Sequence, residues 1–188
     1  MKTKVLLVSL VGALLAVTAC SGEAPSAPAT VTVTPPPAAP DTTTVAWLDG
    51  MCGAIYGFVK ASNDHANRQS SGIEVTRPWL SENLGVRAEL AGKVVDELNA
   101  LPSSPIPGGD AARKSLVDSY TTARDAAAEG KRKLDSSQSQ AALDGGLKAL
   151  EAAQKPLMET TDPFASVKME TPELLTAVAA AKKCVPSP

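Results

Sequence analysis

From Val45 onward, apolar residues recur at three- and four-residue steps, which is the spacing of one face of an α-helix. The first segment with this pattern begins near Asp41 or Thr44 and fades between residues 67 and 71. Its apolar positions are Leu48, Met51, Cys52, Ile55 and Val59. The pattern predicts a helix, although Gly50, Gly53 and Gly57 weaken it intrinsically. We expect this small-residue stripe to let another helix approach closely.

Three further segments repeat the helical spacing, and breaks at residues 70–78, 102–109 and 136–137 separate them. The second segment carries Leu80, Leu84, Ala88, Ala91, Val94, Val95, Leu98 and Leu101. The third carries Leu116, Tyr120, Ala123, Ala127 and Leu134, and the fourth carries Leu143, Leu147, Leu150 and Leu157. We expect Ser81 as a candidate cap for the second helix, Asp110 as the cap of the third, and Pro156 to kink or end the fourth.

A short fifth helix is predicted at the end of the chain. Thr171-Pro172-Glu173 supplies a capping hydroxyl, a proline at the first helical position and an acid in the first turn. Its apolar positions are Leu174, Leu175, Val178, Ala181 and Cys184. The sequence therefore predicts an all-α domain over residues 45–188, an antiparallel bundle of four longer helices plus this short C-terminal helix.

Residues 1–19 have the pattern of a secretory signal. Lys2 and Lys4 form a positive start, residues 5–17 are almost wholly apolar, and two small residues follow. The apolar run is shorter than the roughly 20 residues of a comfortable transmembrane helix.

The signal runs directly into Val17-Thr18-Ala19-Cys20, an aliphatic residue, two small residues and a cysteine. This motif resembles the lipobox of bacterial lipoproteins, and the Ala-, Thr-, Val- and Pro-rich composition resembles that of small actinobacterial lipoproteins. The resemblance implies that Cys20 receives a diacylglycerol, that the signal is cut before it, and that the new amino terminus takes an acyl chain such as palmitate. The domain would then be anchored on the extracytoplasmic face of the cell membrane. The alternatives are a plain secretory peptide with Cys20 left free, and an uncleaved anchor.

Residues 20–44 read as a tether rich in Pro, Thr, Ala and Ser. Pro35-Pro36-Pro37 and Pro40 favour extended polyproline geometry, so we expect a solvated, disordered spacer between lipid and domain. An additional possibility is O-glycosylation of its threonines, because Thr- and Pro-rich stalks are common acceptors. The candidates are Thr30, Thr32, Thr34, Thr42, Thr43 and Thr44.

The three cysteines divide into one lipidation site and one pair. If Cys20 takes lipid, Cys52 and Cys184 remain, and an even pair in an exported protein is typical of a disulfide. The alternative is two separate buried thiols. Two cysteines and one histidine do not supply a closed zinc shell, so no metal and no other cofactor is expected. The chain without its signal has a formal charge of −4, mixed along its length, which argues against binding of nucleic acid or of an anionic surface as the main role.

Few residues suggest chemistry. His65, the only histidine, lies in the polar stretch 62–68, where we expect a solvated surface side chain and no catalytic partner. Lys131, Arg132 and Lys133 suit the negative end of a helix dipole, and contact with anionic lipid or wall polymer is the alternative. Trp79, at a loop–helix junction, is either a binding anchor or a cover over one end of the core.

These observations predict a membrane-anchored envelope lipoprotein whose helical domain is non-enzymatic. The domain would bind or scaffold an envelope protein or a wall component. The alternatives are a hydrolase that acts on cell-wall material, and a carrier of apolar small molecules in a cavity between the helices.

Overall fold

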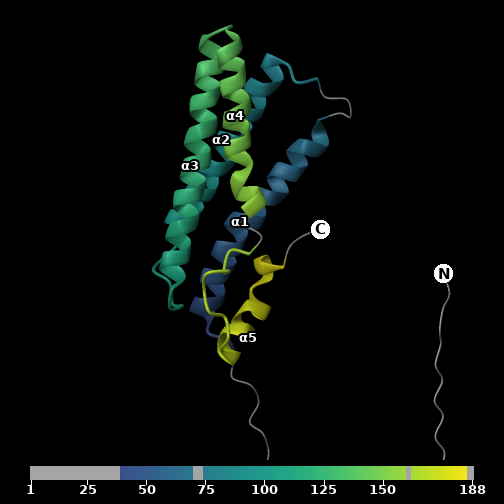
Figure 1. Ribbon diagram of the computed structural model, residues 1–188. Helices are drawn as coiled ribbons and strands as arrows, with labels where there is room; N and C mark the ends of the chain where they lie inside the picture. The colour runs from purple at the N-terminus through teal and green to yellow at the C-terminus, as the bar shows by residue number, and fades with distance from the viewer. Residues whose placement is uncertain (1–38, 70–73, 160–161, 186–188) are drawn as a thin grey trace, which may run out of the picture. The chain divides into compact units, whose positions relative to one another are not determined.

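The computed structural model describes residues 39–69, 74–159 and 162–185, which belong to the second of two units, Ala38–Pro188 (Figure 1). The predicted signal, Cys20 and residues 20–38 of the predicted tether lie outside the described residues. None of the helices in the described ranges has the length and apolarity that crossing a membrane requires.

The described residues are helical and contain no strand, which confirms the predicted fold class. Four longer helices are followed by a short one and a single 3₁₀ turn. They are α1 (Thr42–Arg68), α2 (Arg77–Asn99), α3 (Gly109–Ser136), α4 (Gln140–Glu159), α5 (Pro172–Ala180) and η1 (Lys182–Cys184). Thr42, Thr43 and Thr44, which the sequence assigned to the tether, form the first turn of α1.

Two helix starts follow the sequence expectation. Asp41 caps α1, where its carboxylate accepts a hydrogen bond from the backbone N–H of Thr44 at 2.7 Å. The bonds from Thr44 lower the pKa of Asp41 because they stabilise the ionised carboxylate. Thr171 caps α5 in the same manner, accepting from the N–H of Leu174. In both cases a side-chain oxygen satisfies a donor that the first turn leaves unpaired.

Two other starts correct the sequence expectation. The cap of α2 is Thr76, whose hydroxyl accepts from the N–H of Trp79 at 3.3 Å, and Ser81 lies further inside the helix. The cap position of α3 is held by Gly108 with a φ of 80°. Asp110 instead sits in the first turn, where its carboxylate accepts from the N–H of Ser104 at 3.1 Å. A left-handed turn favours glycine, which has no Cβ, over an aspartate cap.

The C-terminal half departs from expectation at three points. α4 continues three residues beyond Pro156, which is buried in its last turn. α5 ends at Ala180, so Cys184 lies in η1 and not in the helix. Leu147 and Leu175 are 42% and 56% exposed, although their spacing placed them on apolar faces.

The helices pack as successive neighbours. α2 lies along α3, α3 lies along α4, and α4 also touches α2, while α1 packs on α2 and carries α5 and η1 (Figure 1). α3 and α4 approach so closely at Gly130 that a Cβ added there would lie 2.3 Å from the Cβ of Ala149. Such narrow gaps suit a core built mainly from Leu, Val and Ala.

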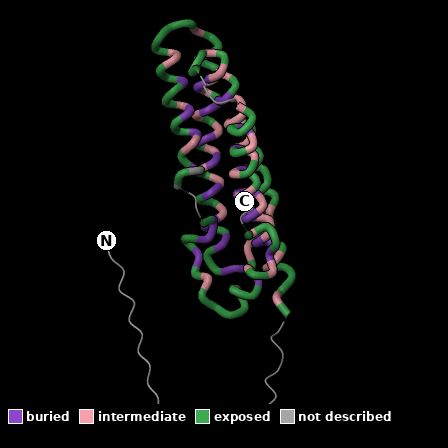
Figure 2. The backbone as a smooth tube through the Cα atoms, turned by 90° about the vertical axis from the view of Figure 1, so that its right-hand side faces the viewer, coloured by how far each residue is buried: buried purple, intermediate pink, exposed green. Residues whose placement is uncertain are grey.

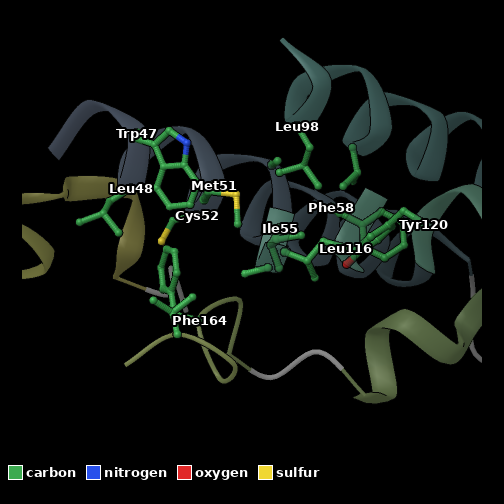
Figure 3. Close-up of a cluster of buried hydrophobic side chains, with 14 of the residues drawn as sticks. Trp47, Leu48, Met51, Cys52, Ile55, Phe58, Leu98, Leu116, Tyr120 and Phe164 are labelled. Carbon is green, nitrogen blue, oxygen red and sulfur yellow. The ribbon is translucent and has the colours of Figure 1, made fainter. Parts of the chain in front are cut away.

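Buried positions line the inward sides of the helices and form two clusters (Figure 2). The first surrounds α1, where the rings of Phe58 and Tyr120 meet edge to face at 4.9 Å and Trp47 lies 6.3 Å from Phe164 (Figure 3). The second cluster lies between α2, α3 and α4. Its buried members are Leu80, Leu84, Ala127, Leu134, Leu150 and Ala153.

A disulfide joins Cys52 to Cys184, which confirms the predicted pair. The two Cα atoms are 4.9 Å apart, and 132 positions separate them in the chain. The bond fastens η1 to the first half of α1.

Candidate functional site

His65 is buried, with 7% of its surface exposed, so the expectation of a solvated histidine is wrong. Ser62, one turn earlier, is 2% exposed. The polar stretch 62–68 is amphipathic, and its inner side packs against α2, where amide groups replace water around the imidazole.

The amide partners of His65 come from both sides of the α1–α2 connection. The Nε2 of Gln69 lies 3.0 Å from His65 Nε2 and 3.2 Å from the Oδ1 of Asn83. That Oδ1 also lies 3.2 Å from His65 Nε2. The indole N–H of Trp79 donates to Gln69 Oε1 at 3.1 Å, and Asn83 Nδ2 donates to the carbonyl of Trp79 at 2.9 Å.

The indole N–H fixes the orientation of this network, because it can only donate. Gln69 must therefore present Oε1 to Trp79 and its amide nitrogen to His65 and Asn83. His65 Nε2 either accepts from Gln69 or donates to Asn83, since one nitrogen cannot do both. Among the described residues, neither a carboxylate nor a hydroxyl group is hydrogen-bonded to His65. The network ties the end of α1 to the start of α2.

Trp79 is half-buried and packs against the second cluster as well as bonding to Gln69. Its neighbour Arg77 donates to the carbonyl oxygens of Leu134 at 3.2 Å and Ser137 at 2.7 Å, where α3 ends. The side chains of Arg77 and Trp79 therefore both have partners within the domain, and Trp79 covers one end of the core.

The basic triplet at residues 131–133 is compensated by acids on its own helix. Lys131 Nζ lies 2.5 Å from Asp135, and Lys133 Nζ lies 3.2 Å from Glu129, which also pairs with Arg132. These bonds lower the pKa of both carboxyls, led by Lys131 at Asp135 and by Arg132 at Glu129. The triplet therefore leaves little uncompensated positive charge.

A groove of about 440 Å³ runs between α1 and η1. The sequence did not predict this site. The α1 side contributes Gly53, Tyr56, Gly57 and Lys60, and the chain end contributes Lys182 and Lys183. We call this the α1–η1 groove.

The disulfide and two nearby contacts hold η1 against α1 and so form one side of the α1–η1 groove. Just before Cys184, the backbone N–H of Lys183 donates to Asp49 Oδ1 at 2.8 Å. Cys184 Sγ lies 3.5 Å from the carbonyl oxygen of Leu48, and this is a packing contact because a disulfide sulfur carries no proton. The position of both lysines therefore depends on the attachment of η1 to α1.

Two members of the glycine stripe of α1, Gly53 and Gly57, line the floor of the groove, and the stripe does not receive another helix along its length. A Cβ added at Gly50 would lie 2.3 Å from Leu101, which follows α2. A Cβ at Gly53 would lie 2.9 Å from the Cδ of Lys183, so the glycine lets that side chain cross α1. Gly57 has no neighbour within 4 Å of its Cβ position and leaves the floor open.

The charges of the groove are not balanced. Lys60 pairs with Asp64 at 2.7 Å. Lys182 and Lys183 are exposed, and neither ammonium forms an ion pair with a carboxylate in the described part of the chain. Burial, and to a lesser degree the charge of Asp162, raises the pKa of Tyr56, so its phenol stays neutral and can donate a hydrogen bond.

A signal for this groove was present in the sequence. Once Cys52 pairs with Cys184, their neighbours Gly53 and Lys183 must lie side by side, so the sequence places a residue without a side chain beside a basic one.

Within the described ranges, no three His, Cys, Asp or Glu residues are grouped to hold a metal ion. No protein family model, curated protein or solved structure matches the chain.

Proposed function

We propose that the protein is a lipid-anchored component of the cell envelope whose helical domain binds another envelope component without catalysis. The disulfide carries the proposal. Disulfides persist in oxidising compartments outside the cytoplasm, and this bond pairs two of the three cysteines. The remaining one, Cys20, is the cysteine that follows the lipobox-like Val17-Thr18-Ala19.

The surroundings of His65 favour binding over hydrolysis. A general base needs a nucleophile or an activated water within hydrogen-bond reach and a group that orients the imidazole. His65 Nε2 instead meets the amide groups of Gln69 and Asn83. Such contacts stabilise the α1–α2 hairpin and offer no nucleophile.

The close helix packing favours binding at the surface over an apolar carrier function. A methyl group added at Gly130 would overlap Ala149, and one added at Gly146 would lie 2.9 Å from Leu80. The space between α2, α3 and α4 is filled at these points. A ligand would therefore bind more readily in a surface groove than between these helices.

The anchor is tested by expressing the wild-type chain and Cys20→Ala in a bacterium that processes lipoproteins. We expect wild type in the membrane fraction with an acylated N-terminal Cys20, and a loss of that modification and of membrane retention in the variant. The double variant Cys52→Ala/Cys184→Ala is the matched control, since it removes two cysteines but should keep the anchor. An unmodified N-terminus in membrane-bound wild type would contradict the lipid assignment.

The binding assignment is tested separately from the anchor. Purified protein is incubated with cell-wall material, and soluble fragments are measured by chromatography and mass spectrometry. We expect no fragments above those of a heat-inactivated sample. Time-dependent release of wall fragments would replace the proposal with the hydrolase alternative.

A further inference from the structure

We propose that the α1–η1 groove binds the phosphate group of a phosphate ester, which names the ligand class of the binding function proposed above and rests on it. The site consists of Lys182 and Lys183, which line the groove together with Gly57, and the side chain of Lys183 lies over Gly53. Neither the lipobox nor the basic triplet at residues 131–133 contributes to it.

The residues that line the groove carry more positive than negative charge, which favours an anion, while the carboxylates of Asp49 and Asp162 lie next to the lining. Three lysines and one acid line it, and the acid, Asp64, is already paired with Lys60. Two ammonium groups remain without an acid partner among the described residues, in a chain whose formal charge is negative. A phosphate monoester carries about −1.5 to −2 charges near neutral pH, which matches these two cations.

The neighbouring groups match the rest of a phosphate site. Tyr56 and Asn63 line the same groove and offer neutral donors to phosphate oxygens. Lysine binds phosphate as a compact point charge and needs no planar fork, so two lysines on one short turn suit a phosphate group. The groove volume of about 440 Å³ lies within the roughly 300–1,000 Å³ of small-molecule sites.

The rim of the groove adds an apolar surface. Val59 and Val185 also line it, and Val185 is 68% exposed beside the two lysines. A phosphate ester with an apolar substituent would bury part of this surface and gain affinity over inorganic phosphate. The same chemistry is available from a phospholipid headgroup and from a soluble phosphate ester.

The groove should exist only while the disulfide is intact. Lys182 and Lys183 lie on a three-residue turn that is fastened to α1 through Cys184 and through the Lys183–Asp49 hydrogen bond. When the bond is reduced, the turn keeps the exposed Lys183–Asp49 hydrogen bond and the packing of buried Ala181 before it, but it loses its covalent link to α1, which weakens the hold on Lys183 over Gly53. Binding is therefore expected to require the oxidised protein.

The test uses the exported full chain with Cys20→Ala, so that acyl chains do not contribute to lipid binding. Inorganic phosphate, glycerol phosphate, short-chain phosphatidic acid and short-chain phosphatidylcholine are titrated, and affinities are measured by calorimetry and by amide shifts of Gly57 and Lys183. Lys182→Gln/Lys183→Gln should weaken binding about tenfold or more, the scale of one charge-assisted hydrogen bond. Lys114→Gln/Lys148→Gln removes the same charge on α3 and α4 and should leave binding unchanged.

Each outcome decides a separate point. Tighter binding of phosphatidic acid than of glycerol phosphate identifies a lipid headgroup, and equal binding identifies a soluble ester. Absence of binding by every phosphate compound, or equal loss in both lysine variants, overturns the site. Fractionation of anchored wild type is independent of these titrations, so a failed site and a failed anchor are distinguished. Loss of binding on reduction, with an unchanged helical circular dichroism spectrum, supports the role of the disulfide.

Discussion

The Cys52–Cys184 disulfide should supply a large share of the domain's stability. The bond closes a loop of about 132 residues, and the loop-entropy relation assigns such a loop about 5 kcal/mol at 25 °C. Measured losses after removal of native disulfides in small secreted domains are about 2–5 kcal/mol. We therefore expect Cys52→Ala/Cys184→Ala to lower the free energy of unfolding by about 2–5 kcal/mol, out of the roughly 5–15 kcal/mol typical of a domain.

The assay is urea unfolding, followed by circular dichroism and by tryptophan fluorescence, with both proteins carrying Cys20→Ala. Trp47 is 1% exposed and close to the disulfide, so its fluorescence reports this end of the core. The matched control is the oxidised parent unfolded with and without reductant, since reduction breaks the bond but keeps both side chains. A loss below about 1 kcal/mol in both comparisons would show that the bond does not constrain the unfolded chain as the relation requires.

Three further changes test the packing. Gly130→Ala should lower the free energy of unfolding by about 1–3 kcal/mol, because the added Cβ would overlap Ala149 of α4. Gly145→Ala should raise it by up to about 1 kcal/mol, because nothing lies within 4 Å of the added Cβ and alanine favours the helix. Equal effects of the two variants in thermal unfolding would refute the close approach of α3 and α4. Asn83→Leu should cost about 1–3 kcal/mol, because it leaves the buried His65 network short of a partner; urea unfolding with no loss would remove that network from the stability argument. Burial raises the pKa of Tyr120, so the folded phenol stays protonated where the unfolded one ionises, above about pH 10. The free energy of unfolding should therefore fall as pH rises above about 10, and Tyr120→Phe should reduce that fall; a pH profile identical in the two proteins would contradict the assignment.

Local signals in the sequence predicted the caps of α1 and α5, but not those of α2 and α3. The side chains of Asp41 and Thr171 accept from the backbone N–H groups three residues later, at Thr44 and Leu174. Neighbouring residues are therefore enough to identify these caps. The disulfide followed from counting the cysteines, because one pair remained once Cys20 was assigned to the lipobox-like motif. The all-α fold followed from apolar spacing.

Features that depend on distant residues were missed. His65 stands in a polar stretch, and only the arrival of Asn83 from α2 makes its burial favourable. Leu147 has helical spacing but faces solvent, because the periodicity defines a face and does not show how far the neighbouring helix covers it. The α1–η1 groove required knowing that the cysteine pair brings Gly53 beneath Lys183.

The bond between positions 52 and 184 also has a topological consequence. Together with the backbone it makes a covalent ring, and α2, α3, α4 and α5 lie wholly inside that ring. A protease that cuts one peptide bond anywhere within it produces two pieces that stay joined through sulfur. A molecule nicked within the ring would keep all its helices on one covalent particle, so a single cleavage there would not by itself release any part of the domain.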